Sequence, residues 1–277
     1  MQFEELCKKF LKDKTLEGCA PGTLREYKGR LKEIGNFLEE NNLKFETLKK
    51  VDISAFLHFL VKKGQKNQTI KNKISTFGVL IKWSVKKGLR DNLDLSEFYH
   101  KVVAAKINRL SDEELKIFKI YIDGLQENIR AAFYLMLGTG CRVGEAAHLK
   151  PTDISLKGKS IYIDIHEAKW GSDRCIPIID QKAAEVVWRY REELHVDSRP
   201  LFRVSKRTLQ GYATDFAKKT GITFRCHLLR HTFAALLTEK GIPITTTQYL
   251  LGHKSLSMTA HYAHSAIADL KDISATI

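Results

Sequence analysis

The sequence has few cysteines and no long apolar run, and both shortages narrow the class of protein. Its five cysteines are scattered and none forms a Cys-x-x-Cys pair, so we expect reduced thiols rather than a disulfide framework. No run of about eighteen apolar residues occurs, which argues against a membrane-spanning helix. The first residues, MQFEELCKKFLKDK, are charged and lack the apolar core of a signal peptide. Together these absences predict a cytoplasmic protein.

Acidic residues are also in short supply. Lysine and arginine number 46 against 32 aspartates and glutamates, which gives a net charge of +14. Residues 62–90 contain nine basic side chains and no acidic one. A lysine-rich surface can serve solubility alone, but this concentration favours a face that contacts phosphate, and we expect double-stranded DNA as the partner. The predicted DNA-binding residues are Lys62, Lys63, Lys66, Lys71, Lys73, Lys82, Lys86, Lys87 and Arg90.

Helical patterns fill the first hundred residues. The first predicted helix covers residues 3–12. Thr23 and Glu26 have the spacing of a capping box, which predicts a second helix that begins at Thr23. An acidic cap at Asp52 predicts a third helix, and Asn67 begins a fourth that runs to about residue 87. Four short helices with a basic last helix predict a DNA-binding domain over residues 1–100.

A polar, basic stretch follows, and we interpret residues 101–109 as a linker and residues 110–277 as a second domain. Ser111 and Glu114 form another capping box at its start. Pro177 lies in the second strand of a predicted hairpin, which places that strand at the edge of its sheet. The predicted strands are residues 160–166 and 174–179, and the predicted helices are 127–137, 142–149, 182–195, 206–220, 227–240, 245–251 and 257–263. The fold class is therefore predicted to be mainly α, with a small antiparallel β-sheet, in two domains.

One segment near the end collects an arginine, a tyrosine and several histidines, namely His227, Arg230, His231, His253 and Tyr262. A metal site is one explanation, because His227 and His231 are four residues apart and share a helix face. The H-E-x-x-H motif, however, needs a glutamate where this chain has a leucine, and Arg230 between the histidines would repel a dication. A second explanation is an ordinary helical core with polar edges, and a third is a site for an anion.

The anion explanation joins these residues into one chemistry. His227 and Arg230 are three residues apart, so they share a helix face, and Gly252 would end a helix beside His253. A guanidinium offers a fork of donors to two phosphate oxygens. The hydroxyl of Tyr262 can attack phosphorus and form a covalent intermediate. Tyr249, the neighbouring tyrosine, lies in a context that favours packing.

Three separated motifs resemble those of the tyrosine recombinase family, which includes phage integrases and Xer-type recombinases. GTGCRVGEAAHL (138–149) is similar to the first arginine box, HLLRH (227–231) to the H-x-x-R box, and LLGHKSLSMTAHYAH (250–264) to the last box. The hairpin lysine of the family falls on Lys169. The likeness covers residues 110–265 closely. The first hundred residues resemble the family's core-DNA-binding domain only in size, helix content and charge.

The resemblance implies a helical core-DNA-binding domain followed by an α+β catalytic domain with phosphotyrosine chemistry. Tyr262 would attack the scissile phosphate, form a 3′-phosphotyrosine and free a 5′-hydroxyl. Arg142 and Arg230 would bind the non-bridging oxygens and stabilise the charge of the phosphorane, and His253 would donate a hydrogen bond to the same charge.

The remaining roles follow from the same resemblance. Lys169 would be the general acid for the departing 5′-oxygen, and His227 would help to move the tyrosine proton. Glu145 and His231 would support these side chains. The resemblance implies no metal and no cofactor, because the covalent link conserves the energy of the phosphodiester bond.

The function implied is site-specific recombination, in DNA integration and excision or in chromosome-dimer resolution. The expected assembly is a homo-oligomer on DNA, with a tetramer favoured, and accessory recombination proteins are partners it could use. Two alternatives stay open. One is a type IB topoisomerase-like enzyme, and the other is a DNA-binding regulator without catalysis. The six matched catalytic positions argue against the regulator, since an inactive scaffold would have no reason to keep them all.

Overall fold

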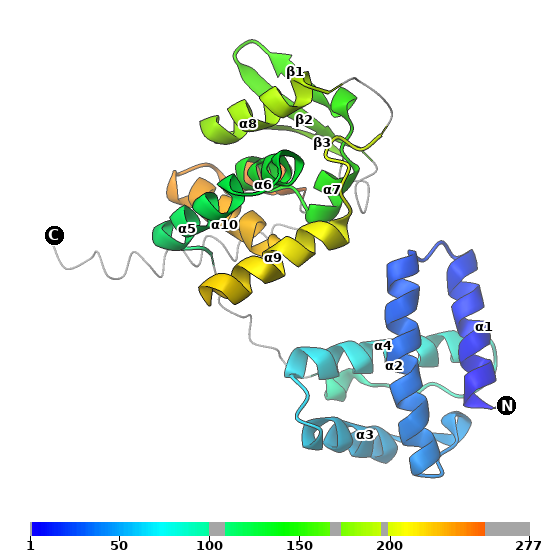
Figure 1. Ribbon diagram of the computed structural model, residues 1–277. Coiled ribbons are helices and arrows are strands. Elements are labelled where there is room, and N and C mark those ends of the chain that lie inside the picture. Colours follow the sequence, from blue (N-terminus) through cyan, green and yellow to red (C-terminus); the bar gives the residue numbers. More distant parts are fainter. Residues whose placement is uncertain (1, 100–108, 167–172, 195–198, 253–277) are drawn as a thin grey trace. The chain divides into compact units, whose positions relative to one another are not determined.

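The computed structural model describes residues 2–99, 109–166, 173–194 and 199–252 (Figure 1). The chain divides into two compact units, Met1–Ala104 and Ala105–Ile277. Each unit has its own hydrophobic core, and among the described residues the two clusters of buried side chains share no member. The linker predicted at residues 101–109 falls outside the described residues except for its last position, and so does the helix predicted at 257–263.

The N-terminal unit is built from helices, as predicted. Its helices are α1 (Phe3–Leu16), α2 (Pro21–Glu40), α3 (Lys50–Lys62) and α4 (Asn67–Lys86), with 3-10 turns at Phe45–Thr47 and Ser96–Phe98. Aromatic rings fill the space between these helices. The ring of Phe56 lies between those of Phe37 and Phe77, with centroid distances of 5.0 Å to Phe37 and 5.8 Å to Phe77. Rings at such distances add specific edge and tilted contacts to the burial of apolar surface.

The starts of two helices differ from the prediction. Helix α2 begins at Pro21 with Ala20 as its N-cap, so Thr23 does not cap it. Proline suits the first helical position because the N–H it lacks would have no partner there. Helix α3 begins at Lys50, and the Asp52 carboxylate accepts a hydrogen bond from the backbone N–H of Lys49 at 2.8 Å. Asp52 thus stabilises the helix from inside its first turn rather than capping it.

The C-terminal unit combines helices with a small sheet. Its helices are α5 (Asp112–Asp123), α6 (Glu127–Thr139), α7 (Val143–His148), α8 (Gln181–Glu192), α9 (Lys206–Thr220), α10 (Cys226–Glu239) and α11 (Ile244–Leu251), with a 3-10 turn at Pro151–Asp153. The predicted capping box at the start of α5 is confirmed, since Ser111 and Glu114 exchange hydrogen bonds with each other's backbone N–H. None of the described helices is both long and apolar enough to cross a lipid bilayer.

The sheet has three antiparallel strands in the order β1-β2-β3 rather than the predicted two. The strands are β1 (Ile154–Lys157), β2 (Ser160–Ile165) and β3 (Arg174–Pro177). The prediction missed β1, a four-residue strand whose Ile154 pairs with Ile163 of β2. Pro177 lies on β3 at the edge of the sheet, where the N–H it lacks is not needed for a further strand.

Helix α6 is the centre of the C-terminal unit. It packs against α5, α7, α8 and α10 (Figure 1), and every residue from Ala131 to Thr139 is buried. A helix that is apolar on all sides requires such a position. It ends at Gly140, which has a positive φ of 63° and lies close to the Phe233 ring of α10. This tight end brings the chain directly to Arg142 at the start of α7.

We expect Gly140→Ala to destabilise the C-terminal unit by roughly 3 kcal/mol, from backbone strain and from overpacking. A Cβ atom at this position would lie 2.4 Å from Cδ1 of Phe233. Gly221→Ala is the matched control, because Gly221 has a φ of 73° but open space around the added Cβ. It should cost only about 1–2 kcal/mol. Differential scanning calorimetry measures both, and equal losses would show that the contact with Phe233 contributes nothing.

Candidate active site

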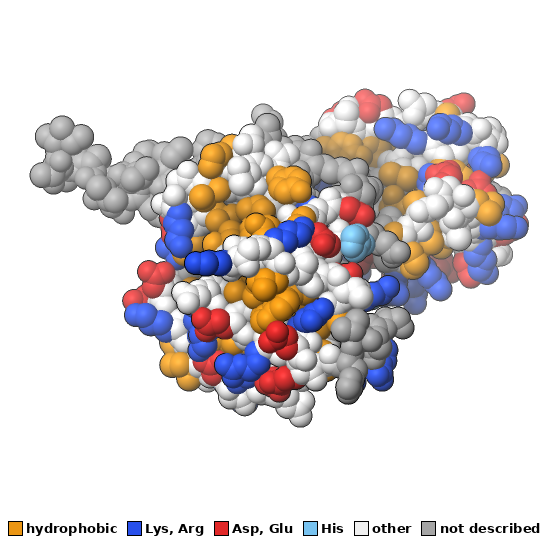
Figure 2. Space-filling model, turned by 90° about the horizontal axis from the view of Figure 1, so that it is seen from above, with side chains coloured by type: hydrophobic (Ala, Val, Ile, Leu, Met, Phe, Trp, Pro, Cys, Tyr) orange, Lys and Arg blue, Asp and Glu red, His pale blue; other side chains and the backbone are white. Residues whose placement is uncertain are grey.

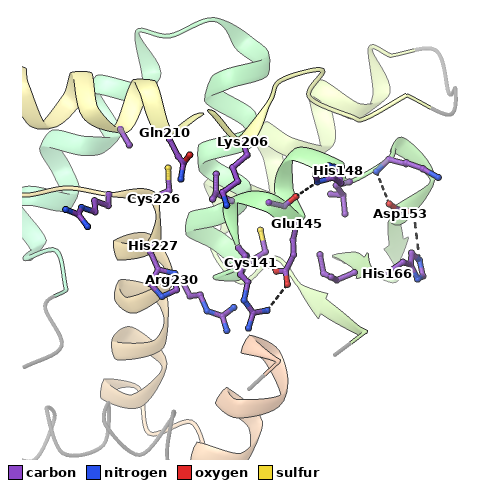
Figure 3. A pocket seen from close by; sticks show the side chains of 18 of the residues that line it. Cys141, Glu145, His148, Asp153, His166, Lys206, Gln210, Cys226, His227 and Arg230 are labelled. Carbon is purple, nitrogen blue, oxygen red and sulfur yellow. Dashed lines mark hydrogen bonds and ion pairs between the residues drawn. The ribbon is translucent and has the colours of Figure 1, made fainter. Parts of the chain in front are cut away.

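A cleft of about 900 Å³ opens in the C-terminal unit (Figure 3). Arg142, at the start of α7, and His227 and Arg230, on α10, line it. Helix α9 contributes Lys206 and Gln210 to another part of the wall. The structure thus brings together three residues that lie in two separate sequence motifs and that were predicted to be catalytic.

Arg142 is held by a carboxylate one helical turn away. It is the N-cap residue of α7, and its backbone N–H donates to Oε2 of Glu145 at 2.7 Å. Its Nη1 donates to Oε1 of the same carboxylate at 2.8 Å. The Arg142 side chain keeps 28% of its surface exposed. The guanidinium is therefore oriented from behind while remaining accessible from the cleft.

Glu145 is itself shared with a second arginine. Nη2 of Arg174, at the start of β3, lies 2.9 Å from Oε2 of Glu145, and Nη1 lies 3.3 Å from Oε1. Burial alone would raise the pKa of Glu145, but the hydrogen bonds and charge of Arg174, together with the bonds from Arg142, hold that pKa below its usual value. Glu145 therefore stays ionised and supports Arg142, in the supporting position predicted from the sequence.

Arg230 is the largest fully buried side chain of the described residues, with 1% of its surface exposed. Its Nη1 donates to the carbonyl oxygen of Gly140 at 3.0 Å, and its Nη2 donates to that of Leu251. A buried guanidinium is stable only when polar groups replace its hydration. These two carbonyls fix the Arg230 side chain at the floor of the cleft.

The C-terminal end of α11 contacts all three arginines. Three consecutive carbonyls each accept from a different one: Leu250 from Nε of Arg174 at 2.8 Å, Leu251 from Nη2 of Arg230, and Gly252 from Nη2 of Arg142 at 3.5 Å. The last carbonyls of a helix lack partners within the helix and carry the negative end of its dipole. This helix end therefore gathers positive charge beside the cleft.

The two histidines of α10 form a pair. Their rings meet edge to face, with centroids 4.5 Å apart. Partial removal from water, followed by the charges of Arg230 and Arg142, lowers the pKa of His227. Removal from water, His227 and Arg230 lower the pKa of His231 to about 4. Both rings are therefore neutral near pH 7, as required of His227 if it is to accept a proton.

Three of the predicted catalytic residues, Lys169, His253 and Tyr262, lie outside the described residues. The described neighbours of two of them border the site. Residue 169 falls between the ends of β2 and β3, and Gly252 immediately precedes residue 253. Gly252 has a φ of 63°, and a Cβ atom there would lie 3.0 Å from Nη1 of Arg174. A side chain at this position would be strained by the positive φ and would crowd the guanidinium.

Sequence reasoning missed Arg174. The alternation in β3 carries a usable signal, because Arg174 shares its face with Ile176 and Ile178, and all three are buried. An arginine on the buried face of a strand needs an acidic partner. The pattern cannot reveal which carboxylate pairs with Arg174, since Glu145 lies 29 residues away in the sequence.

Three of the nine predicted DNA-binding residues are committed to the fold of the N-terminal unit. Lys73 is buried and forms an ion pair with Glu33. Arg90 donates to the carbonyls of Phe45 and Leu48 at 2.8 and 3.0 Å. Lys87, although exposed, pairs with Asp13 at 2.7 Å. Lys73 and Arg90 are therefore not expected to contact phosphate. Lys87 is expected to contribute a weaker phosphate contact, because Asp13 neutralises it.

The other six predicted residues are exposed lysines, namely Lys62, Lys63, Lys66, Lys71, Lys82 and Lys86. Lys71, Lys82 and Lys86 recur on α4 at spacings that place them on one face. On the side of the molecule drawn in Figure 2, blue basic and red acidic side chains are interspersed. Lys71, Lys82 and Lys86, which lie on one face of α4, are called the basic stripe of α4 below.

Two further observations concern the alternatives raised by the sequence. Among the described residues, no group of three or more histidine, cysteine, aspartate or glutamate side chains is placed to hold a metal ion. Tyr249 was expected to pack in the core, but it is 58% exposed on α11. The core position in that turn is occupied by Leu250 and Leu251 instead.

Comparisons with known proteins match both units. Residues 108–268 match the phage integrase family, and residues 8–88 match the phage integrase N-terminal SAM-like domain. Tyrosine recombinase XerC of Staphylococcus carnosus is 28% identical over 275 residues, covering 91% of this chain and 89% of that protein. Tyrosine recombinase XerA of Pyrococcus furiosus is 30% identical over 278 residues, covering 97% and 92%. A lambda integrase tetramer bound to a Holliday junction has a similar fold, with a TM-score of 0.75 and 23% identity over 95% of this chain and 77% of that one.

We expect His231 to titrate with a midpoint near 4 in the folded protein, against about 6.5 in the unfolded chain. Proton NMR of the ring resonances measures both values, the second in urea. Because the unfolded chain binds the proton more readily, the free energy of unfolding should fall as pH drops from about 6.5 towards 4. His231→Gln should reduce that fall. A midpoint near 6.5 in the folded protein would contradict the burial argument.

Proposed function

The chain belongs to the phage integrase family and is a site-specific tyrosine recombinase, and we propose that it cleaves and rejoins double-stranded DNA through a 3′-phosphotyrosine at Tyr262. The observation that carries this proposal is the pair of arginines at the cleft. Arg142 is oriented by Glu145, and Arg230 by the carbonyls of Gly140 and Leu251. Two guanidiniums fixed before the substrate arrives are suited to the non-bridging oxygens of a phosphodiester.

The electrostatics of the cleft support the same chemistry. Glu145, the carboxylate that binds Arg142, is shared with Arg174, so its single negative charge offsets only part of the positive charge of these arginines. Such surroundings favour a pentacoordinate phosphorane, which carries more negative charge than the diester. They also favour the phenolate of a tyrosine that enters the cleft.

The remaining groups are assigned from the sequence motifs. Tyr262 would attack the phosphorus, and Lys169 would protonate the departing 5′-oxygen. His253 would donate a hydrogen bond to a non-bridging oxygen. His227, whose lowered pKa keeps its ring neutral, would accept the proton of Tyr262. His231 lies against the His227 ring and would hold its orientation.

DNA binding is proposed to include the N-terminal unit. The basic stripe of α4, formed by Lys71, Lys82 and Lys86, is exposed and is suited to the phosphate backbone. Contacts of this kind position a protein on the duplex without reading its sequence.

The proposed assembly is a homotetramer, by analogy with the lambda integrase tetramer bound to a Holliday junction. Exchange of strands between two duplexes needs four cleaving subunits, whereas a type IB topoisomerase-like enzyme would act alone on one duplex. The similarity to XerC and XerA over most of the chain favours recombination over that alternative. The biological outcome, integration and excision or chromosome-dimer resolution, follows from the DNA site.

We expect Tyr262→Phe to abolish a covalent complex with DNA. Labelled nicked duplexes tiled across the DNA around the gene are incubated with the protein in EDTA and denatured in SDS. A nick beside the cleaved bond lets the short 5′-hydroxyl strand diffuse away, so the phosphotyrosine accumulates.

Tyr249→Phe is the matched control, because Tyr249 is an exposed tyrosine of the same region. It should leave the covalent band intact. A band that survives Tyr262→Phe but disappears with Tyr249→Phe would identify Tyr249 as the nucleophile instead. Tight DNA binding without any band would favour the regulator.

We expect replacing Lys71, Lys82 and Lys86 with glutamine to weaken binding to all duplexes alike. The slope of log affinity against log salt should become shallower by about 2–3, since each phosphate contact contributes roughly 0.9. The control replaces Lys8 and Lys9, which pair with Glu4 and Glu5 on α1. Fluorescence anisotropy at several salt concentrations measures the slope. An unchanged slope would exclude the α4 stripe from the interface.

A further inference from the structure

Arg174 is a buried charge that the proposed reaction does not yet use. Its side chain is 2% exposed, although it begins a strand at the edge of the sheet. Burying an arginine removes it from water, which is unfavourable unless its partners are well placed. A leucine or isoleucine would continue the apolar face formed by Ile176 and Ile178 without this cost.

The partners of Arg174 are parts of the cleft. Its two Nη atoms donate to the two oxygens of Glu145 at 2.9 and 3.3 Å. The same carboxylate accepts hydrogen bonds from Nη1 and from the backbone N–H of Arg142. The exposed fraction of the side chain rises along this chain of contacts, from 2% for Arg174 through 9% for Glu145 to 28% for Arg142. Glu145 therefore transmits the position of a buried arginine to one that is open to the cleft.

The third donor of Arg174 reaches the other side of the site. Its Nε donates to the carbonyl of Leu250 at 2.8 Å, and its guanidinium lies against Gly252. Arg230 and Arg142 hold the carbonyls of Leu251 and Gly252. Arg174 thus joins the Arg142–Glu145 pair to the end of α11, where the chain continues to His253.

We propose that Arg174 is a positioning residue for DNA cleavage, which sets Arg142 through Glu145 and sets the end of α11 through the Leu250 carbonyl. The inference rests on the proposed function, because it assigns Arg142 to the scissile phosphate. Lysine cannot replace the guanidinium here, since a single ammonium cannot span both carboxylate oxygens and the carbonyl. Without Arg174, Arg142 becomes the main counter-charge of Glu145 and is drawn away from the phosphate.

The test compares Arg174→Met and Arg174→Lys in single-turnover cleavage of the nicked duplex at saturating protein. We expect the cleavage rate to fall about 100-fold in Arg174→Met, which is the scale for misplacing a catalytic group by about 1 Å. Arg174→Lys should recover only part of this loss. The affinity for the duplex should change less than about threefold, because the side chain of Arg174 is buried and has almost no surface with which to contact DNA.

A merely structural role is separated by changing the phosphate. In a duplex whose scissile phosphate is a methylphosphonate, one non-bridging oxygen is lost, and Arg142 has less charge to stabilise. The defects of Arg174→Met and Arg142→Lys should both shrink on this substrate, and the double variant should be no slower than the worse single variant. Loss of structure alone would slow both substrates by the same factor.

Lys73→Met provides the control for burial of a charge. Lys73 is likewise buried and paired with a glutamate, but it belongs to the N-terminal unit and is not one of the residues that line the cleft. It should lower the melting temperature without changing the ratio of cleavage rates on the two substrates. Cleavage by Arg174→Met at the wild-type rate, or an equal loss on both substrates, would overturn the inference alone. Absence of any Tyr262-dependent cleavage by the wild type would overturn the proposed function and this inference with it.

Discussion

The arrangement of arginines in the cleft depends on the carboxylate of Glu145, which binds both Arg142 and Arg174. It neutralises part of the charge of two arginines that would otherwise repel each other, and it orients both by paired hydrogen bonds. One partner is buried in the sheet and the other faces the cleft. The precise direction of Arg142 therefore derives from the packing of β3, which is far more rigid than a side chain exposed to solvent.

A second constraint is the end of α11, where three arginines occupy three successive carbonyls. Helix ends usually meet water or a capping side chain. Here the carbonyls that lack partners within the helix accept hydrogen bonds from arginine side chains, and these bonds hold the end of α11 in place. Because arginine stays protonated throughout the physiological pH range, this arrangement keeps its charge where histidine would lose it. The neutral His227 is the group proposed to accept a proton, and the His231 ring packs against it.

Local sequence signals predicted most of the elements, and they failed where tertiary contacts decide. Helices α4 and α9 were predicted within one residue, because apolar periodicity and boundary residues agree there. Strand β1 was missed, since four residues carry too little alternation and the strand exists only by pairing with β2. His227 and Arg230 were found from their spacing on one helix face, and Arg142 from the resemblance of its motif. The burial of Lys73 and the partner of Arg174, in contrast, depend on contacts between distant segments.

The two separate hydrophobic cores have an evolutionary consequence. A substitution that loosens the packing of α1–α4 leaves the apolar contacts beneath the arginines untouched, and the reverse also holds. Each unit therefore has its own tolerance of mutation. Lineages can alter the N-terminal surface that is proposed to bind DNA while the residues of the cleft stay constant, so target preference and chemistry are free to diverge at different rates.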